Sequence, residues 1–344
     1  MSDEAAQRHW SDPGVELVAP GVHRVPLPLP MDGLRAVNVY VLETDAGLTC
    51  IDAGWAIDAS RRLLETSLRS IGYRVSDIRR FLVTHVHRDH YTQAVTVRRE
   101  LGRATVELGV GEKPTLDLFH SAGLDEDPTV ARLHGAGAAD IAARWRRMFE
   151  GREPDLDMWA YPDRWLDGEQ TVEVGGRALR AVPTPGHTAG HVVFVDEQSG
   201  LLFAGDHVLP TITPSVGFEL VYARDPLGDF LGSLHRVRAL PDLRLLPAHG
   251  PVTASSHRRV DELLQHHDAR LELCRRAVAA GAVTAYDVAQ RLTWTRRERA
   301  LDELDVFNSA LAVMETLVHL DLLVFRGRLG RDQVDGTWCY AADR

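Results

Sequence analysis

The stretch THVHRDH, residues 84–90, places three histidines and one aspartate in a single short turn. It directly follows the apolar run FLV, which is typical of a buried strand, so the turn begins where a strand ends. His85 and His87 are two residues apart and can face the same way, whereas Asp89 and His90 project at other angles as the chain enters the next helix. This one turn can therefore supply ligands to two adjacent metal ions.

Three other strand ends carry polar side chains of the same kind. His187 lies in TPGHTAGH, Asp206 in FAGDH and His249 in LLPAHGP. Because side chains at strand ends project into the loops above a sheet, we expect these residues to share one cleft with residues 84–90. Five histidines and two aspartates suit two first-row divalent ions with positions left open for water, rather than a closed structural zinc site.

The composition is that of an ordinary globular protein. The chain has 344 residues, of which 44% are hydrophobic and 26% charged, and this length allows two domains. The three cysteines are far apart and show no CxxC spacing, so any metal must be held by histidine and carboxylate. A net charge of −10 argues against nucleic-acid binding through bulk electrostatics. The N-terminus lacks a signal-peptide pattern, which predicts a cytoplasmic protein with no membrane partner.

The order of patterns along the chain predicts an α/β protein. Strands and helices alternate in the first part, and helical spacing of apolar residues over about 111–163 predicts a helical insert that shapes the substrate pocket. Strands return from about 170. From Ser255 onward, three helices followed by two strands predict a small winged-helix-like domain. We therefore expect a catalytic domain over 1–254 and a winged-helix-like domain over 255–344.

The combined motifs resemble those of the metallo-β-lactamase-fold hydrolases. The resemblance runs from about Val15 to Pro251 and includes IDAG with Asp52, HVHRDH, TPGHTAGH, FAGD and PAHG. It implies a four-layer αβ/βα sandwich with the site at one edge, between the two sheets. It also implies that Asp52 buttresses the loops that carry the ligands. By this resemblance the first metal is bound by His85, His87 and His187, the second by Asp89, His90 and His249, and Asp206 bridges the two.

The expected reaction is hydrolysis. Two such ions hold a bridging hydroxide and polarise a substrate carbonyl or phosphoryl oxygen, and Asp89 is the expected catalytic residue that orients the hydroxide. TPGHTAGH resembles the form found in glyoxalase II and related thioesterases and lactonases, which favours an ester, thioester or lactone of a small molecule. We expect zinc. Iron and manganese are alternatives, because imidazole and carboxylate ligands suit all three metals. The candidate substrate contacts near the ligands are Tyr91, His191, His207 and Tyr222.

Two other functions remain open. The C-terminal region resembles the winged-helix domain of a branch that includes an endoribonuclease and proteins of polyketide pathways, so phosphodiester hydrolysis is an alternative. Residues 255–344 contain 13 arginines against 14 acidic residues, a poor balance for binding phosphates. A noncatalytic winged-helix binder with a structural metal site is the other alternative, and the complete ligand set argues against it. A homodimer is left open.

Overall fold

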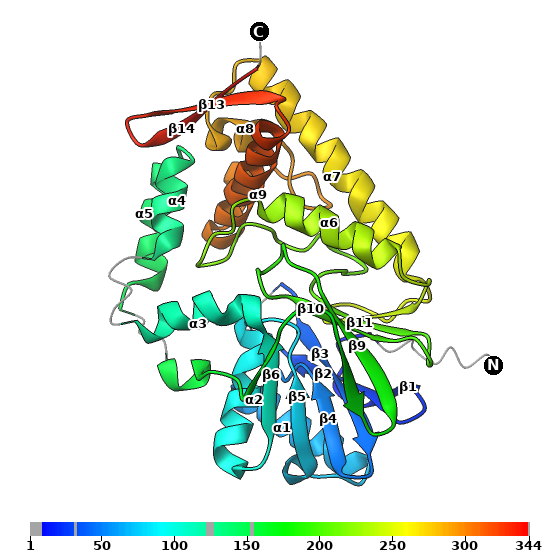
Figure 1. Cartoon of the computed structure of the whole chain (residues 1–344). Helices are drawn as coiled ribbons and strands as arrows, with labels where there is room; N and C mark the ends of the chain where they lie inside the picture. Colours follow the sequence, from blue (N-terminus) through cyan, green and yellow to red (C-terminus); the bar gives the residue numbers. More distant parts are fainter. Residues whose placement is uncertain (1–8, 31–32, 122–126, 152–154, 343–344) are drawn as a thin grey trace, which may run out of the picture.

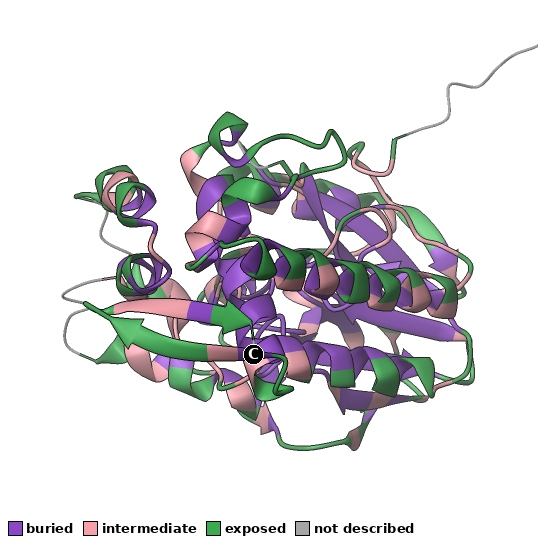
Figure 2. Cartoon of the chain, turned by 90° about the horizontal axis from the view of Figure 1, so that it is seen from above, coloured by how far each residue is buried: buried purple, intermediate pink, exposed green. Residues whose placement is uncertain are grey.

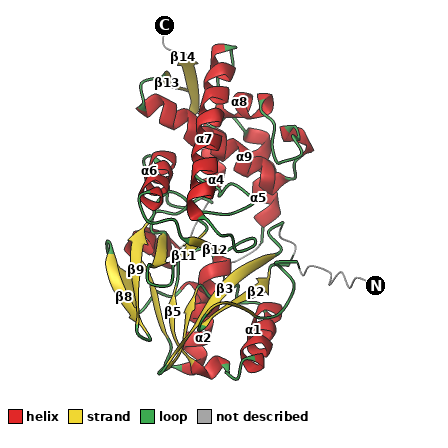
Figure 3. Ribbon diagram, turned by 90° about the vertical axis from the view of Figure 1, so that its right-hand side faces the viewer, coloured by secondary structure: helices red, strands yellow, loops and turns green. Residues whose placement is uncertain are grey.

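The computed structural model describes residues 9–30, 33–121, 127–151 and 155–342. Two β-sheets pack face to face, and helices cover the outer face of each (Figure 1). This is the four-layer α/β sandwich that the motifs predict, so the expected fold class is confirmed. The C-terminal helices extend beyond the sandwich (Figure 3).

The first sheet has seven strands in sequence order. The first four pair as antiparallel neighbours, and the last three add to the sheet in parallel. Parallel pairing needs a crossover, and helices α1 (Asp58–Ser70) and α2 (Arg88–Leu101) supply the first two. The strands are β1 (Glu16–Ala19), β2 (Val22–Pro28), β3 (Ala36–Thr44), β4 (Gly47–Ile51), β5 (Ile78–Leu82), β6 (Thr105–Gly109) and β7 (Arg164–Leu166).

The second sheet has five strands in the order β12-β11-β10-β9-β8. Its strands pair as antiparallel neighbours except for β11 and β12, which run parallel around the crossover helix α6 (Pro226–Arg238). The turn between β8 and β9 contains Gly175 and Gly176, both with positive φ, which suits a two-residue hairpin turn. The strands are β8 (Gln170–Val174), β9 (Arg177–Pro183), β10 (Val192–Asp196), β11 (Leu201–Gly205) and β12 (Arg244–Pro247).

Buried apolar side chains hold the layers together. Between the sheets, Leu42 and Ile51 share a cluster with Phe194 and Phe203. A second cluster joins the outer face of the first sheet to α1 and α2. Figure 2 shows the strands of the sandwich mostly in the buried colour. Strand ends that emerge from such a packed core are held rigidly, which is what a metal-binding loop requires.

Helices fill most of the segment between β6 and β7. They are α3 (Lys113–His120), α4 (Pro128–Gly135) and α5 (Ala139–Phe149), with short 3-10 turns before and after them at η2 (Val110–Glu112) and η3 (Leu156–Trp159). Figure 1 shows α4 and α5 standing beside the C-terminal helix α9 rather than against the first sheet. Trp145 of α5 stacks on Phe307 of α9, with ring centroids 5.7 Å apart. The inserted helices therefore join the sandwich to the C-terminal part.

The C-terminal part consists of helices followed by a hairpin, in the predicted order. These elements are α7 (Ser256–Ala279), α8 (Ala285–Arg291), η4 (Leu301–Glu303), α9 (Val306–Phe325), β13 (Leu329–Val334) and β14 (Thr337–Ala342). The Thr284 side chain caps the N-terminus of α8. One apolar cluster runs from the outer face of the second sheet through α6 into these helices and the insert. A winged-helix identity and a domain boundary at residue 254 stay predictions.

Helix α9 is long and apolar enough to span a membrane by length and composition alone. In the structure, 72% of its most apolar 18-residue window is buried inside the protein. Its apolar residues contact α5, α7 and α8, so its composition is explained by its position at the centre of the C-terminal core.

One boundary differs from the expectation. The sequence pattern predicts that the helix after the THVHRDH turn begins near Thr92, but α2 begins at Arg88, inside the motif. Asp89 thus lies in the first helical turn, where a carboxylate interacts favourably with the helix dipole. The two halves of the motif are consequently held differently, with the first histidines on a loop and the last two polar residues on a helix.

Candidate metal centre

The structure brings all seven sequence-predicted ligand residues together at one edge of the sandwich. They form two groups whose donor atoms lie within 4.8 Å of one another inside each group. Both groups draw on the turn after β5 and on the loops that follow strands of the second sheet, which explains why residues so far apart in sequence meet. The first group is His85, His87, His187 and Asp206, and the second is Asp89, His90 and His249.

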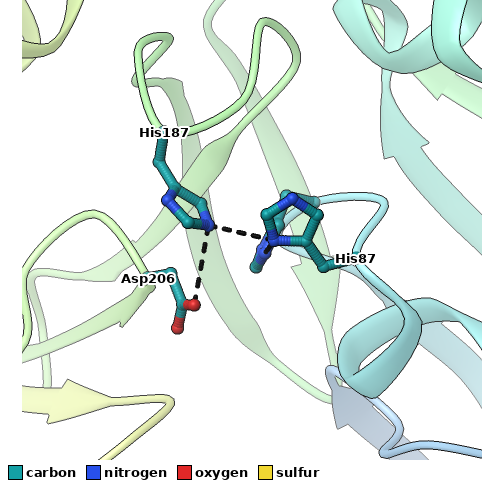
Figure 4. A group of neighbouring side chains, drawn as sticks. His87, His187 and Asp206 are labelled. Atoms are coloured by element: carbon teal, nitrogen blue, oxygen red, sulfur yellow. Dashed lines mark hydrogen bonds and ion pairs between the residues drawn. The ribbon is translucent and has the colours of Figure 1, made fainter. Parts of the chain in front are cut away.

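Asp206 lies between the two groups. Its Oδ2 is 3.6 Å from Nε2 of His187, an ion pair drawn as a dashed line in Figure 4. Its Oδ1 is 3.3 Å from Nε2 of His249. Oδ1 is also 3.7 Å from Nε2 of His90. One oxygen of this carboxylate therefore faces each group, which is the arrangement required of a bridging ligand.

Asp52 fixes the orientation of His90. The carboxylate is buried and accepts hydrogen bonds from the Thr84 backbone N–H at 2.8 Å and from Nδ1 of His90 at 2.9 Å. With the His90 proton held on Nδ1, Nε2 is left as the free donor atom facing the centre. Asp52 itself has a positive φ of 59°, which an aspartate tolerates better than most residues. The structure thus places Asp52 where a buttressing residue is expected.

Backbone carbonyls orient two further histidines, His187 and His249, in the same way. Nδ1 of His187 donates to the Ser215 carbonyl at 2.7 Å, and Nδ1 of His249 donates to the Ala36 carbonyl at 2.8 Å. The Asn38 amide donates to the carbonyls of Pro247 and Gly250, which flank His249. Nε2 of both histidines therefore points toward the centre, and strand β3 of the first sheet helps to hold a loop of the second.

Burial keeps three of the histidines neutral. It lowers the pKa of His85 well below its usual value, lowers that of His87 to about 3 and lowers that of His187. The neutral imidazole is the form that binds metal, because its free nitrogen carries a lone pair. These side chains would need no deprotonation to accept a metal ion near neutral pH.

The second group carries an excess of negative charge. Burial alone would lower the pKa of His90, but Asp89, Asp52 and Asp206 outweigh it and raise the pKa to about 10. Burial alone would raise the pKa of Asp206, but His249 and His90 hold it well below its usual value. Without a metal, protonated histidine is what balances these carboxylates. A divalent cation would balance them equally well.

Three buried polar atoms at the centre have no hydrogen-bond partner among the described residues: His90 Nε2, Asp206 Oδ1 and His249 Nε2. Buried polar atoms are normally satisfied, and leaving several unpaired in one place costs free energy. Lone pairs from imidazole and carboxylate that converge on one point match the ligand preferences of zinc and related ions. The donor set therefore fits a divalent metal.

The candidate substrate contacts differ in their surroundings. Tyr91 is fully buried, and its hydroxyl donates to the Ala160 carbonyl at 2.6 Å. His191 accepts from the Asp206 backbone N–H at 3.2 Å, and His207 packs edge-on against Phe230, so both lie behind the ligand loops. The Tyr222 hydroxyl is buried and has no partner among the described residues. His207 and Tyr222 are thus the candidates whose buried polar atoms have no hydrogen-bond partner among the described residues.

Two buried carboxylates beside the ligand loops were not predicted from the sequence. Glu112 accepts a hydrogen bond from the Thr188 hydroxyl at 2.5 Å, and Glu219 accepts one from the Ala189 backbone N–H at 2.5 Å. Glu112 follows the end of β6 just as the ligands follow other strands, so the same strand-end reasoning would have found it. Glu219 lies in the long loop after β11, where no pattern marks it.

Comparison with known proteins gives a consistent family. A family model described as the metallo-beta-lactamase superfamily matches residues 32–249. The probable metallo-hydrolase YqjP of Bacillus subtilis is 26% identical over 311 residues, which cover 87% of this chain and 90% of that protein. The lactamase-like protein aptB of Emericella nidulans is 36% identical over 248 residues, which cover 70% of this chain and 59% of that protein.

Solved structures extend the likeness to nearly the full length. A beta-lactamase domain protein from Burkholderia ambifaria is 30% identical with a TM-score of 0.78, covering 98% of this chain and 96% of that one. A metallo-beta-lactamase family protein from Thermus thermophilus is 27% identical with a TM-score of 0.74, covering 95% of this chain and 100% of that one. The C-terminal helices are therefore common to these proteins. Family match, fold and ligand cluster together establish that the chain belongs to the metallo-beta-lactamase superfamily and is a metallo-hydrolase of that superfamily.

Proposed function

We propose that the protein is a dinuclear metal-dependent hydrolase that acts on an ester, thioester or lactone of a small molecule. The observation that carries this proposal is the convergence of two ligand groups on Asp206, with buried nitrogen and oxygen atoms at the centre that have no hydrogen-bond partner among the described residues. Zinc is the proposed metal. Two divalent ions bound there would supply Lewis acidity to the substrate carbonyl and a water nucleophile active near neutral pH.

The protein's own residues would orient the ligands and the attacking water. Asp52 holds the His90 proton on Nδ1, and Asp206 keeps the two ligand groups at a fixed separation. Asp89 is the ligand carboxylate with the greatest side-chain exposure, 14% against 9% for Asp206. It is therefore the carboxylate best placed to orient the attacking water, to hold its proton and to return that proton to the leaving group.

Packing of the insert bears on the choice of substrate. Trp145 contacts Phe149, Phe218 and Phe307, so these aromatic rings form the junction between the insert and the C-terminal helices. Phe119 stacks on Trp159, with ring centroids 4.5 Å apart. These rings pack against one another, within the insert and against α9 and the loop after β11, rather than lining an open acyl pocket. The case for an ester, thioester or lactone therefore rests on the form of TPGHTAGH.

The test combines metal analysis with a substrate panel. Elemental analysis of the purified protein should give about two divalent ions per chain, and a chromogenic ester, an acyl thioester or a lactone should be hydrolysed in a metal-dependent way. A labelled RNA serves as the comparison substrate. Cleavage of RNA with inert esters would replace the proposed substrate class by phosphodiesters. A protein without bound metal, and inactive when metal is added, would contradict the proposal.

A further inference from the structure

Glu112 lies at the end of the short 3-10 turn η2, at the entrance to the helical insert. Its side chain is fully buried even though it carries a carboxylate. A charged group is expensive to bury unless it is hydrogen-bonded, so its partners indicate what it is for.

The groups that interact with the Glu112 carboxylate come from the two loops that carry the three histidines of the first ligand group. The Thr188 hydroxyl donates to Oε1 at 2.5 Å, and Thr188 directly follows His187. Burial raises the pKa of Glu112 to about 7, while the Thr188 hydroxyl and the backbone N–H groups of Val86 and Gly190 interact with the carboxylate and oppose that rise. Val86 lies between His85 and His87. One carboxylate therefore bonds to the residue that follows His187 and interacts electrostatically with the backbone N–H of the residue between His85 and His87.

Close backbone packing accompanies these contacts. A methyl group at Gly190 would overlap the Glu112 backbone nitrogen, and one at Gly111 would overlap the Ala189 carbonyl. Only glycine allows the two chain segments to approach so closely. From another side, Glu219 accepts a hydrogen bond from the Ala189 N–H. The loop 186–190 is thus held by carboxylates from two separate parts of the chain.

Glu107 shows what a purely structural buried carboxylate looks like in the same region. It lies on β6 with a side-chain exposure of 2%, and its Oε1 pairs with Arg80 at 2.6 Å. The same Oε1 also lies 3.6 Å from Nη1 of Arg164. Its side chain therefore pairs with arginines of neighbouring strands, whereas that of Glu112 meets the ligand loops.

We propose that Glu112 is a positioning residue that ties the His187 loop to the turn carrying His85 and His87, so that these three histidines are held ready for the first metal. This inference rests on the proposed two-metal site. It adds that the two metal positions depend unequally on Glu112, because the second group is oriented by Asp52 and by the Ala36 carbonyl.

The test measures metal affinity rather than turnover. Metal-stripped wild-type protein and variants are titrated with Zn²⁺ against a chelator, and Co²⁺ spectra report each site separately. Glu112→Leu should lower the affinity for one of the two ions by roughly 10–100-fold, as is typical when a residue that hydrogen-bonds behind the ligands is lost. The weakened position should be the one that His187→Ala also loses. Glu112→Gln keeps an oxygen that accepts from Thr188 and should restore most of the affinity.

Two controls separate positioning from general damage. Glu107→Leu removes a comparably buried carboxylate and should lower the melting temperature without changing the ratio of the two metal affinities. Thr188→Val keeps the side-chain volume but removes the hydroxyl donor, so it replaces Glu112→Leu if that variant does not fold. Thr188→Val should lower the affinity for the same ion several-fold.

The results separate the two proposals. If Glu112→Leu weakens the binding of both ions equally, so that the ratio of the two metal affinities is unchanged, the role of Glu112 is overturned while the metal site stays in place. Where Glu112→Leu does not fold, an unchanged ratio in Thr188→Val has the same meaning. Absence of metal binding by the wild-type protein would instead overturn the proposed function, and this inference with it.

Discussion

Two groups of buried histidines in the described part of the chain differ in their surroundings. In the metal centre, histidines alternate with the carboxylates of Asp89 and Asp206. In the C-terminal core, His267 of α7 stacks on His319 of α9, with Nδ1 of the first 3.1 Å from Nε2 of the second. Burial lowers the pKa of His319 to about 3 and that of His267 well below its usual value.

The difference shows that buried histidines alone do not make a metal site. Nδ1 of His319 donates to the Glu315 backbone carbonyl, so the C-terminal pair is bound into helix packing. Among the described residues, the groups able to hold a metal ion are those built around Asp89 and Asp206. Carboxylates supply the negative charge that a divalent cation requires, whereas the ring of His267 contacts Phe230 and His266 outside the pair.

The strongest test of this contrast removes the central carboxylate. Asp206→Ala takes away the side chain that faces both ligand groups, so bound metal should fall and hydrolysis should drop by at least about 10³-fold, equivalent to several kcal/mol of lost transition-state stabilisation. Elemental analysis and turnover with the best substrate of the panel measure the two effects. Normal metal content together with normal turnover would show that Asp206 is not a ligand.

Replacing the buttressing carboxylate should have a smaller effect. Oδ1 of Asp52 accepts from the Thr84 N–H and Oδ2 accepts from Nδ1–H of His90, so with asparagine at this position one of these donors would face the amide NH2 group. Asp52→Asn should therefore weaken metal binding by roughly 10–100-fold while the protein stays folded. Chelator competition gives the affinity, and circular dichroism checks the fold. Wild-type affinity would mean that His90 is oriented without Asp52.

The C-terminal pair should affect pH-dependent stability and not metal binding. An unfolded histidine takes up its proton below about pH 6.5, whereas folded His319 does so only near 3, so the free energy of unfolding should fall as the pH drops between these values. One histidine contributes a slope of up to about 1.4 kcal/mol per pH unit. His319→Leu should flatten the slope measured by urea unfolding between pH 6.5 and 5. An unchanged slope, or a lower metal content, would contradict the contrast.

The smallest effect is expected beside the metal centre itself. Tyr91 follows His90, but its hydroxyl is bound to the Ala160 carbonyl. Tyr91→Phe should reduce stability by about 1 kcal/mol through the lost hydrogen bond and leave kcat and KM unchanged. Thermal unfolding and steady-state kinetics test the two halves. A fall in kcat would instead support Tyr91 as a substrate contact.

The sequence predicts the sandwich and the meeting of the ligands well because both follow from local rules. Alternating apolar residues mark each strand, and polar residues such as His187 and Asp206 mark the strand ends. What it predicts poorly depends on packing between distant segments. The start of α2 at Arg88 and the hydroxyl direction of Tyr91 are set by tertiary contacts. Helical periodicity likewise cannot say that the insert packs on α9.

The contacts that hold His249 have a consequence for the order in which the protein is made. Its ring is bound to Ala36, and the neighbouring carbonyls are bound by Asn38, more than two hundred residues earlier in the chain. During synthesis, the histidines of residues 84–90 leave the ribosome long before the strand that completes their site. Metal capture therefore belongs to the last stages of folding, and a nascent chain halted before residue 249 would expose an incomplete ligand set.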